Sequence, residues 1–442
     1  MERTLILDCN SKIGKTVKIC GWVQTRRDHG KILFLDVLDR SGLIQVVVTD
    51  LPAGGLHLQD VVCIEGKVNK RPENLINKNI STGEIEIAAD SVEILSKAEE
   101  LPFDTGGKDL NLQLPTLLDF RSLTLRHPKV KAIFKVQAAL LEGFRKAAKD
   151  LGCTEIVVPT IVAGATEGGA EVFKIDYFDH KAFLSQSPQL YKQMLVPVYE
   201  RVFTVAKAYR AEPSVTTRHL AESTQLDIEI GFIEFEDLLN FLEEVAVKML
   251  KAASEECSDI LFDFGVESIV FGSPREAGKI PRFTLRKAQD LIFKQFGRDN
   301  RKEKDLTPQD EIDLCKWSKE NHGSDLVTVT HFPTKAKPFY TMPDPKDAEY
   351  SLSYDLLFRG VEILSGSQRI NDYDQLVNSM KQREVNPDNF GMYLQAFKFG
   401  MPPEGGFSFG LERMTMHMLG LSNIREASLF PRDMERVDVR LK

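Results

Sequence analysis

Charged residues gather on either side of a short loop in the sequence YRAEPSVTTRHLAE, residues 209–222. Arg210 and Glu212 precede the loop, and Arg218 and His219 follow its central residues. A guanidinium group is planar, keeps its charge and offers paired hydrogen bonds, so it suits a triphosphate or a carboxylate ligand. The segment is therefore typical of an anion-binding turn, but it fits a salt-bridged hairpin equally well.

A second polar segment surrounds a predicted tight turn at Arg359-Gly360. In a hairpin with this turn, Leu357 faces Glu362, and Asp355 shares a face with Glu362 along a diagonal. Two carboxylates about 6–8 Å apart can hold one Mg²⁺ ion. Because the polar sequence SGSQR follows directly, we favour a magnesium site over a plain surface hairpin.

A third segment joins a glycine-rich strand to the start of an apolar helix. Residues 405–413, GGFSFGLER, end on Arg413, and the sequence MTMHMLGL follows. Glycine lets a flat ligand approach the backbone, and an arginine at a helix start can meet a phosphate. Such strand ends are common, so this segment supports an anion site only in combination with the other two.

Five short segments near the N-terminus have the composition of β-strands and are separated by Gly, Asp and Asn residues. They are residues 15–24, 31–40, 43–50, 60–70 and 83–95. This close spacing predicts a small Greek-key barrel of the oligonucleotide-binding (OB) type in residues 1–100. The strand count fits other small β-barrels equally well.

A polar stretch, residues 101–125, is interpreted as a hinge, and the pattern changes after it. Residues 129–152 have helical periodicity and end at Gly152. Later strand-like segments follow one another without obligatory helices between them, which favours an α+β domain with a mainly antiparallel sheet over residues 126–442. Neither a complete phosphate-binding loop nor a helix-opening Gly-x-Gly-x-x-Gly motif occurs, so a nucleotide needs another binding device.

Composition narrows the class of protein. The 442 residues are 42% hydrophobic and carry a formal net charge of −8, so nucleic acid can bind only at a local patch, and an acidic metabolic enzyme fits equally well. The sequence has neither a signal-peptide pattern nor a long apolar run, and its six cysteines form no C-x-x-C pair. We therefore expect a cytoplasmic protein with reduced thiols, without a membrane span or a structural metal.

Two of the three polar segments, with an earlier helix, resemble the signature motifs of class II aminoacyl-tRNA synthetases. Residues 210–220 are similar to the second motif and residues 410–413 to the third, while the helix ending in EIVVP before Pro159 is similar to the first. Four further segments resemble aspartyl-tRNA synthetases in particular: residues 166–169, 186–193, 365–369 and 423–433. The resemblance covers essentially the whole chain, with a compact archaeal-like catalytic domain and a bacterial-like barrel.

The resemblance implies ATP-dependent activation of L-aspartate and its transfer to tRNA(Asp). Arg210 and Arg413 are then catalytic, and Lys192 and Arg369 hold the aspartate side chain, two cations that select a negative ligand over a neutral amide. The full implied aspartate site is Glu167, Gln189, Lys192, Arg210, Asp227, Ser365 and Arg369. Glu404 stands where these enzymes usually have histidine.

ATP and Mg²⁺ are implied in the same way. The implied ATP site is Arg210, Ala211, Glu212, Arg218, His219, Leu220, Glu362, Gly410, Leu411, Glu412 and Arg413. Glu362, Ser365 and Asp355 are the implied magnesium ligands. Aspartate itself attacks the α-phosphate in this scheme, so catalysis rests on positioning and electrostatics.

The barrel is implied to read the anticodon. Its candidate residues are Arg26, His29, Phe34, Gln45 and Glu86, with Phe34 stacking on a base and Gln45 reading the middle base. The alternative for Phe34 is core packing. A histidine at position 29 tends to accompany relaxed enzymes, so tRNA(Asn) is a candidate second substrate; the alternative for His29 is a solvated loop residue.

Two rival functions remain. An asparagine–tRNA ligase shares the barrel and the three motifs, but Lys192 argues against it, because a buried ammonium facing a neutral amide lacks a charge partner. A catalytically silent RNA-binding paralogue is disfavoured by intact Arg210, Glu362 and Arg413. We also expect a homodimer that uses the helix from about Lys131 and the strand before Pro159, whose apolar content exceeds what one helix face needs.

Overall fold

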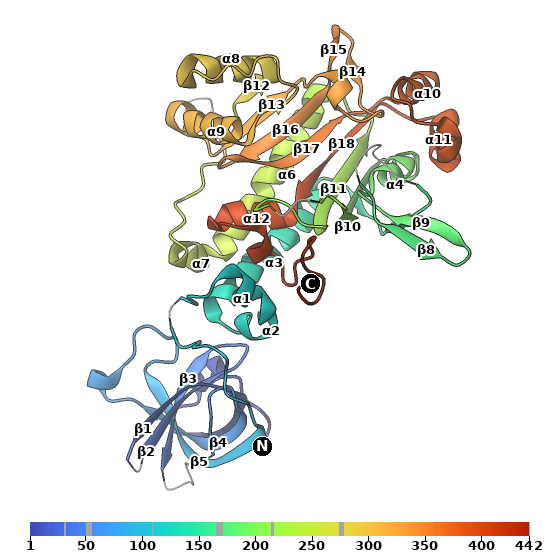
Figure 1. The fold of residues 1–442 in the computed structure, drawn as a ribbon. Helices are drawn as coiled ribbons and strands as arrows, with labels where there is room; N and C mark the ends of the chain where they lie inside the picture. The colour runs from blue at the N-terminus through green and yellow to red at the C-terminus, as the bar shows by residue number, and fades with distance from the viewer. Residues whose placement is uncertain are drawn as a thin grey trace. The chain divides into compact units, whose positions relative to one another are not determined.

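The computed structural model describes residues 1–30, 32–49, 55–107, 109–164, 171–213, 216–273 and 278–441. The chain divides into two compact units, Met1–Asn111 and Leu112–Lys442 (Figure 1). The division falls inside the stretch interpreted as a hinge. The C-terminal part of that stretch forms two short helices of the larger unit, α1 (Leu114–Asp119) and α2 (Arg121–Thr124).

The smaller unit is a closed barrel in which the strand order is β1-β2-β3-β5-β4. The strands are β1 (Thr16–His29), β2 (Ile32–Leu38), β3 (Leu43–Thr49), β4 (Val61–Lys70) and β5 (Ile85–Ser96). Buried apolar residues of every strand fill the interior; on β2, Leu33, Leu35 and Val37 alternate with more exposed residues. All five strands were predicted from their composition and from the turn residues between them, and the barrel prediction is confirmed.

An eight-stranded sheet forms the centre of the larger unit, in the order β12-β13-β16-β17-β18-β11-β10-β6. In that order the strands are β12 (Arg282–Thr284), β13 (Leu326–Thr330), β16 (Ser353–Phe358), β17 (Val361–Gln368), β18 (Glu404–Gly410), β11 (Glu222–Gly231), β10 (Arg201–Tyr209) and β6 (Thr154–Glu155). The six central strands pair antiparallel, and only the outermost pairs at each edge are parallel. The mainly antiparallel sheet was predicted correctly.

The two faces of this sheet differ in character. On β11, Leu226, Ile228 and Ile230 enter the main core, where they pack with two long helices, α3 (Pro128–Asp150) and α6 (Phe235–Glu256). The alternate residues of β11, such as Asp227 and Glu229, point to the opposite face. One face of the sheet therefore supplies the core, and the other is free to carry polar side chains.

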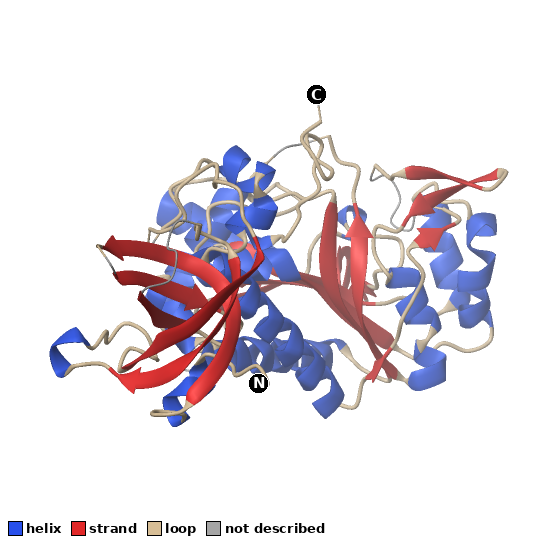
Figure 2. Ribbon diagram, turned by 90° about the horizontal axis from the view of Figure 1, so that it is seen from below, coloured by secondary structure: helices blue, strands red, loops and turns tan. Residues whose placement is uncertain are grey.

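Shorter elements surround the sheet, as the blue helices of Figure 2 show. They are α4 (Gln189–Met194), α5 (Val196–Tyr199), α7 (Ser258–Asp263), α8 (Leu285–Phe296), α9 (Pro308–His322), α10 (Tyr373–Gln382), α11 (Gly391–Lys398) and α12 (Leu411–Leu419), with the strands β7 (Ile161–Val162), β8 (Lys174–Tyr177), β9 (His180–Leu184), β14 (Pro343–Asp344) and β15 (Asp347–Ser351). Within the described part of the chain, no helix is long and apolar enough to cross a membrane.

Two predicted details need correction. The strand expected at EIVVP pairs only at its start, as β6, because Val157 is 96% exposed and the chain leaves the sheet before Pro159. The hairpin turns at Arg359-Gly360 as predicted, and both residues have positive φ angles. A bulge after Leu356 nevertheless shifts the register, so Asp355 pairs with Ser365.

Candidate active site

A cavity of about 290 Å³ lies on the polar face of the sheet. Its walls come from β11, β17, β18, α4 and the loops that follow β10 and precede β14. The lining residues are Ser187, Gln189, Lys192, Arg210, Arg218, His219, Leu220, Ser223, Gln225, Asp227, Lys337, Pro338, Tyr340, Thr341, Glu362, Ile363, Ser365, Gly366, Ser367, Arg369, Ser408, Gly410, Glu412, Arg413 and Ile424. The three polar segments singled out in the sequence therefore meet in one place.

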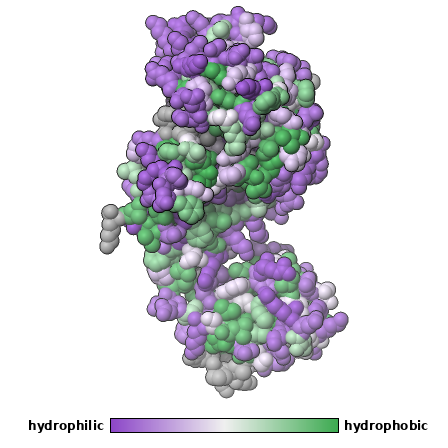
Figure 3. Space-filling view, turned by 90° about the vertical axis from the view of Figure 1, so that its right-hand side faces the viewer, coloured by the Kyte–Doolittle hydropathy of each residue, from purple (hydrophilic) through white to green (hydrophobic). Residues whose placement is uncertain are grey.

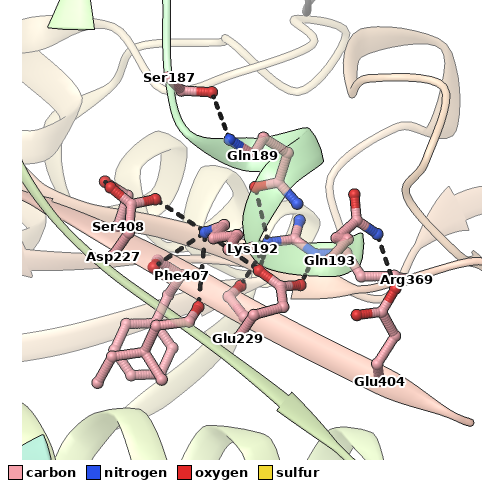
Figure 4. A network of polar contacts seen from close by, with 12 residues as sticks. Ser187, Gln189, Lys192, Gln193, Asp227, Glu229, Arg369, Glu404, Phe407 and Ser408 are labelled. Atoms are coloured by element: carbon pink, nitrogen blue, oxygen red, sulfur yellow. Dashed lines mark hydrogen bonds and ion pairs between the residues drawn. The ribbon is translucent and has the colours of Figure 1, made fainter. Parts of the chain in front are cut away.

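Two cations and two carboxylates form a buried network at one end of the cavity (Figure 4). The Lys192 ammonium lies 2.8 Å from an Asp227 oxygen and 3.1 Å from a Glu229 oxygen. The Arg369 guanidinium lies 2.7 Å from the other Glu229 oxygen. All four side chains are at most 5% exposed, so each charge depends on its partners for stability.

The two carboxylates of this network differ in their protonation energetics. Burial raises the pKa of Asp227 above its usual value, although the Lys192 ammonium opposes the shift. Burial acts in the same direction on Glu229, but Arg369 and Lys192 outweigh it and hold the pKa of Glu229 below its usual value. Glu229 is therefore the fixed anion of the network, while Asp227 is the carboxylate that gains most from a further cation.

The missing side chain of Gly406 makes room for this network. A Cβ atom at position 406 would lie 2.1 Å from a Glu229 carboxylate oxygen and 2.3 Å from the Ile228 carbonyl oxygen. The sequence suggested that this glycine-rich strand admits a ligand, whereas at Gly406 the structure uses the space for the carboxylate that positions Arg369.

Gln189 completes this end of the cavity. Its side-chain oxygen accepts a hydrogen bond from Arg369 Nη2 at 3.3 Å. Its side-chain nitrogen is buried and has no hydrogen-bond partner among the described residues. Because an unpaired buried donor is costly, this amide is suited to an acceptor on a ligand.

The other end of the cavity is rich in arginine. Arg210 is exposed, and its side chain makes no hydrogen bond or ion pair within the described ranges. Arg413 donates to the Glu362 carbonyl oxygen at 2.9 Å, and Arg218 lies 3.4 Å from Glu311. Three guanidinium groups around one cavity are the arrangement that a polyphosphate requires.

Carboxylates stand beside these arginines. Burial raises the pKa of Asp355 to about 7, opposed by Lys337 and reinforced by Glu362. Burial and Glu362 likewise raise the pKa of Glu311 to about 7. Such clustered acids are stabilised by an added cation, although the described residues include no group of three or more His, Cys, Asp or Glu side chains placed to hold a metal.

Most of the residues predicted for the site line this cavity. Those that do are Gln189, Lys192, Arg210, Arg218, His219, Leu220, Asp227, Glu362, Ser365, Arg369, Gly410, Glu412 and Arg413. Ala211, Glu212, Leu411 and Asp355 are not in the lining; Leu411 packs in the core, and Asp355 is ion-paired with Lys337 at 3.4 Å. Glu167 lies outside the described residues.

The sequence did not assign a role to three residues that now matter. Glu229 bridges the two buried cations, and Lys337 and Tyr340 line the cavity from the loop before β14. The strand alternation that places Asp227 on the polar face also places Glu229 there, so the signal for Glu229 was present. Nothing local marks Lys337 or Tyr340, because their loop reaches the site through the tertiary fold.

The barrel carries its own polar row. Thr25, Asp36, Gln45 and Glu86 are successive cross-strand neighbours on β1, β2, β3 and β5. The Gln45 amide donates to Glu86 at 2.9 Å, and its oxygen accepts from Arg71 at 3.0 Å. Gln45 and Glu86, predicted independently as base readers, are therefore in direct contact.

Two predicted aromatic residues lie beside this row. Phe34 is only partly buried and alternates with the core residues of β2, so the core-packing alternative is wrong for its side chain. Its ring meets the His29 ring edge to face, with centroids 5.7 Å apart. Arg26 pairs opposite the core residue Leu35 and forms an ion pair with Asp28 at 3.1 Å, so it lies on the other face of the hairpin.

Comparison with known proteins agrees with this geometry. Residues 113–434 match the family described as tRNA synthetases class II (D, K and N). The chain belongs to this family. Residues 17–95 of this class II synthetase match the OB-fold nucleic acid binding domain, so its predicted architecture is confirmed.

Relatives of this class II synthetase cover the whole chain. It is 40% identical over 440 residues to the aspartate–tRNA(Asp/Asn) ligase of Thermus thermophilus. The match covers 98% of this chain and 99% of that protein. The synthetase is 38% identical to the aspartate–tRNA(Asp) ligase of Pyrococcus horikoshii, with 96% of each chain covered. The asparaginyl-tRNA synthetase of Pyrococcus horikoshii in complex with asparaginyl-adenylate is similar in structure, with a TM-score of 0.89, 30% identity and 99% of each chain covered.

Proposed function

We propose that this synthetase is an aspartate–tRNA ligase, and the buried network of Lys192 and Arg369 is the observation that carries the proposal. The ammonium group of an incoming amino acid pairs with Asp227, whose raised pKa favours a further cation. The remaining charges are Lys192, Arg369 and Glu229, which leave one uncompensated positive charge. A side-chain carboxylate neutralises that charge, whereas an asparagine amide leaves it buried and unpaired.

Activation follows from the position of the arginines. The α-carboxylate of aspartate attacks the α-phosphorus of ATP, a carboxylate–phosphorus bond forms, the bond to the bridging oxygen breaks, and pyrophosphate leaves. Arg210 neutralises the charge that develops between carboxylate and phosphate, and Arg413 and Arg218 hold the rest of the triphosphate. The terminal ribose of the tRNA then takes the aminoacyl group, and AMP leaves.

Magnesium fits the acidic side of the cavity. Glu362 and Ser365 both line the cavity next to the arginines. Asp355 is hydrogen-bonded to Ser365, and burial raises its pKa to about 7. Mg²⁺ is usually held by one or two carboxylates, with water and phosphate oxygens. When bound, the ion supplies charge neutralisation to the phosphates; Glu362, Ser365 and, behind them, Asp355 are the residues that would hold it.

The barrel is proposed to bind the anticodon of tRNA(Asp) and also that of tRNA(Asn). Support comes from the polar row of Gln45 and Glu86, with the rings of Phe34 and His29 beside it. An imidazole can donate or accept a hydrogen bond, so His29 can serve either pyrimidine at the third anticodon position. One relative carries a name for both tRNAs and another a name for tRNA(Asp) alone.

A homodimer is also proposed, although on different grounds from those given by the sequence. The apolar side chains of α3, among them Leu140 and Phe144, are buried in the chain's own core, so they do not form an exposed interface. The segment that follows α3 does expose apolar residues: Val157 is 96% exposed and Ile161 is 45% exposed. Figure 3 shows further hydrophobic side chains on one face of the larger unit.

Pyrophosphate exchange into ATP tests the proposed activity. The wild-type enzyme should exchange with aspartate and show at most weak exchange with asparagine. Exchange driven by asparagine and not by aspartate would support an asparagine–tRNA ligase, and no exchange with any amino acid would support the silent RNA-binding alternative.

A further inference from the structure

Glu404 is a buried acid next to the two cations of the pocket and outside the cavity lining. It is 0% exposed at the start of β18. One carboxyl oxygen accepts a hydrogen bond from the Gln193 amide at 2.8 Å, and the other oxygen has no partner among the described residues (Figure 4). The backbone oxygen of Glu404 accepts from the Arg369 N–H at 2.9 Å.

These contacts join Glu404 to the two segments that carry the cations. Gln193 directly follows Lys192 on α4, and its side-chain oxygen accepts a hydrogen bond from the Tyr393 hydroxyl at 3.1 Å. Glu404 therefore contacts the chain neighbour of Lys192 through its side chain and Arg369 through its backbone. A change in the charge of Glu404 acts on both ends of the network.

The surroundings favour the neutral acid. A fully buried carboxylate that accepts a single hydrogen bond is more costly when it is ionised than when it is neutral, because burial penalises a charge far more than an unpaired hydroxyl group. Burial and the nearby Glu229 carboxylate raise the pKa of Glu404 well above its usual value. The titratable and charged groups that surround it are Lys192 on α4, Glu229 on β11, Arg369 after β17 and Tyr393 on α11.

The protonation state of Glu404 affects the charge balance of the amino-acid pocket. Lys192 and Arg369 are already matched by Asp227 and Glu229, and the proposed substrate brings one ammonium and one side-chain carboxylate into this network. An ionised Glu404 would be a third buried negative charge near the same cations, and it would compete with the substrate carboxylate for them.

We propose that Glu404 is a positioning residue that acts as a neutral acid: protonated, it holds Gln193 and leaves the charge of Lys192 and Arg369 available to the aspartate side chain, and its ionisation weakens aspartate binding. The inference rests on the proposed aspartate activity. Ionisation of Glu404 should therefore change KM for aspartate and leave KM for ATP unchanged.

The test compares the wild type with two variants by pyrophosphate exchange from about pH 6.5 to about pH 9.5. E404Q is the matched mimic of the protonated acid, because its amide keeps the oxygen that accepts from Gln193 and cannot ionise. E404A removes that acceptor, and E349Q, on the exposed β14–β15 hairpin, is the surface control. KM for aspartate, KM for ATP and kcat are measured for each enzyme.

At neutral pH, E404Q should keep the wild-type KM for aspartate within about threefold, and E404A should raise it. Once Glu404 ionises at alkaline pH, the wild-type and E349Q values should rise by about tenfold per pH unit relative to E404Q. KM for ATP should stay parallel in all four enzymes. Parallel aspartate profiles for wild type and E404Q, or an E404Q defect equal to that of E404A at neutral pH, would overturn the inference. Absence of aspartate-dependent exchange in the wild type would instead defeat the proposed function.

Discussion

The Arg369 guanidinium lies 2.7 Å from the Glu229 carboxylate, and the carboxylate reaches the Lys192 ammonium at 3.1 Å on its other side. One buried anion thus fixes the separation of two cations in the amino-acid pocket. Because Glu229 holds both, neither cation can move toward solvent without leaving a buried charge unpaired. This pre-arranged pair is what the proposed selectivity for aspartate depends on.

Replacing Arg369 by leucine should abolish aspartate activation while ATP binding persists. The change removes a cationic partner from the substrate carboxylate and one of the two cationic partners of Glu229, a loss of about 3–5 kcal/mol for a buried pair. Aspartate-dependent pyrophosphate exchange and calorimetric ATP binding measure the two effects separately. R301L, at an arginine whose side chain is 43% exposed, is the control. Unchanged exchange in R369L would remove Arg369 from the pocket.

His417 gives the fold a defined acid sensitivity. Burial, with Arg218 and Arg413 nearby, lowers the pKa of His417 to about 4, against 6.5 for a free imidazole. Between these values the unfolded chain binds the proton and the folded chain does not, so stability rises with pH across this window and is lost as pH falls through it. The full effect is about 3 kcal/mol.

Urea denaturation of the wild type and of H417Q, at several pH values from about 7 to about 4, measures this contribution. The free energy of unfolding of the wild type should fall relative to that of H417Q as the solution becomes more acidic. A difference between the two proteins that does not vary with pH would contradict the buried neutral imidazole.

Selection between the two tRNAs should depend on His29. We expect the wild type to charge tRNA(Asp) and tRNA(Asn) with efficiencies within about tenfold, about 1.4 kcal/mol. H29L should lose most of the activity toward tRNA(Asn), because an apolar side chain cannot satisfy both pyrimidine edges. H57L, at another exposed histidine of the barrel, should leave the ratio unchanged. Strong rejection of tRNA(Asn) by the wild type would contradict this role of His29.

Val157→Asp should weaken the proposed homodimer. Burying an unpaired carboxylate in an apolar interface is unfavourable, so the variant should dissociate at concentrations where the wild type is dimeric. Sedimentation velocity at micromolar protein provides the masses, and F262D, at a phenylalanine that is 82% exposed on α7, is the control. A fully active wild-type monomer under these conditions would rule the dimer out.

The sequence predicted those parts of the fold that depend on local patterns. Strand-like composition and intervening turn residues predicted the barrel strands, and the hairpin turn was placed at Arg359-Gly360, where the structure has two positive φ angles. The bulge that pairs Asp355 with Ser365 was not predicted, because an inserted residue changes register without changing the apolar pattern. The helices α8 and α9 were also missed; α9 has charged residues on most of its surface.

The sequence predicted those charged site residues that lie in recognisable polar segments. Arg210, Glu362 and Arg413 stand out in their segments, and the structure brings them to one cavity. The partnership of Glu229 with Lys192 and the unpaired oxygen of Glu404 depend on how strands and helices meet. Sequence could name the cations, but it could not say which carboxylates hold them.

The most direct test of the central claim is the identity of the amino acid that the enzyme attaches to tRNA. Wild-type enzyme is incubated with ATP, Mg²⁺, tRNA(Asp) and equal concentrations of aspartate and asparagine, and the ester on the isolated tRNA is identified by mass spectrometry. The buried pair of Lys192 and Arg369 predicts aspartyl-tRNA as the product. Asparaginyl-tRNA as the main product, or tRNA left uncharged, would contradict it.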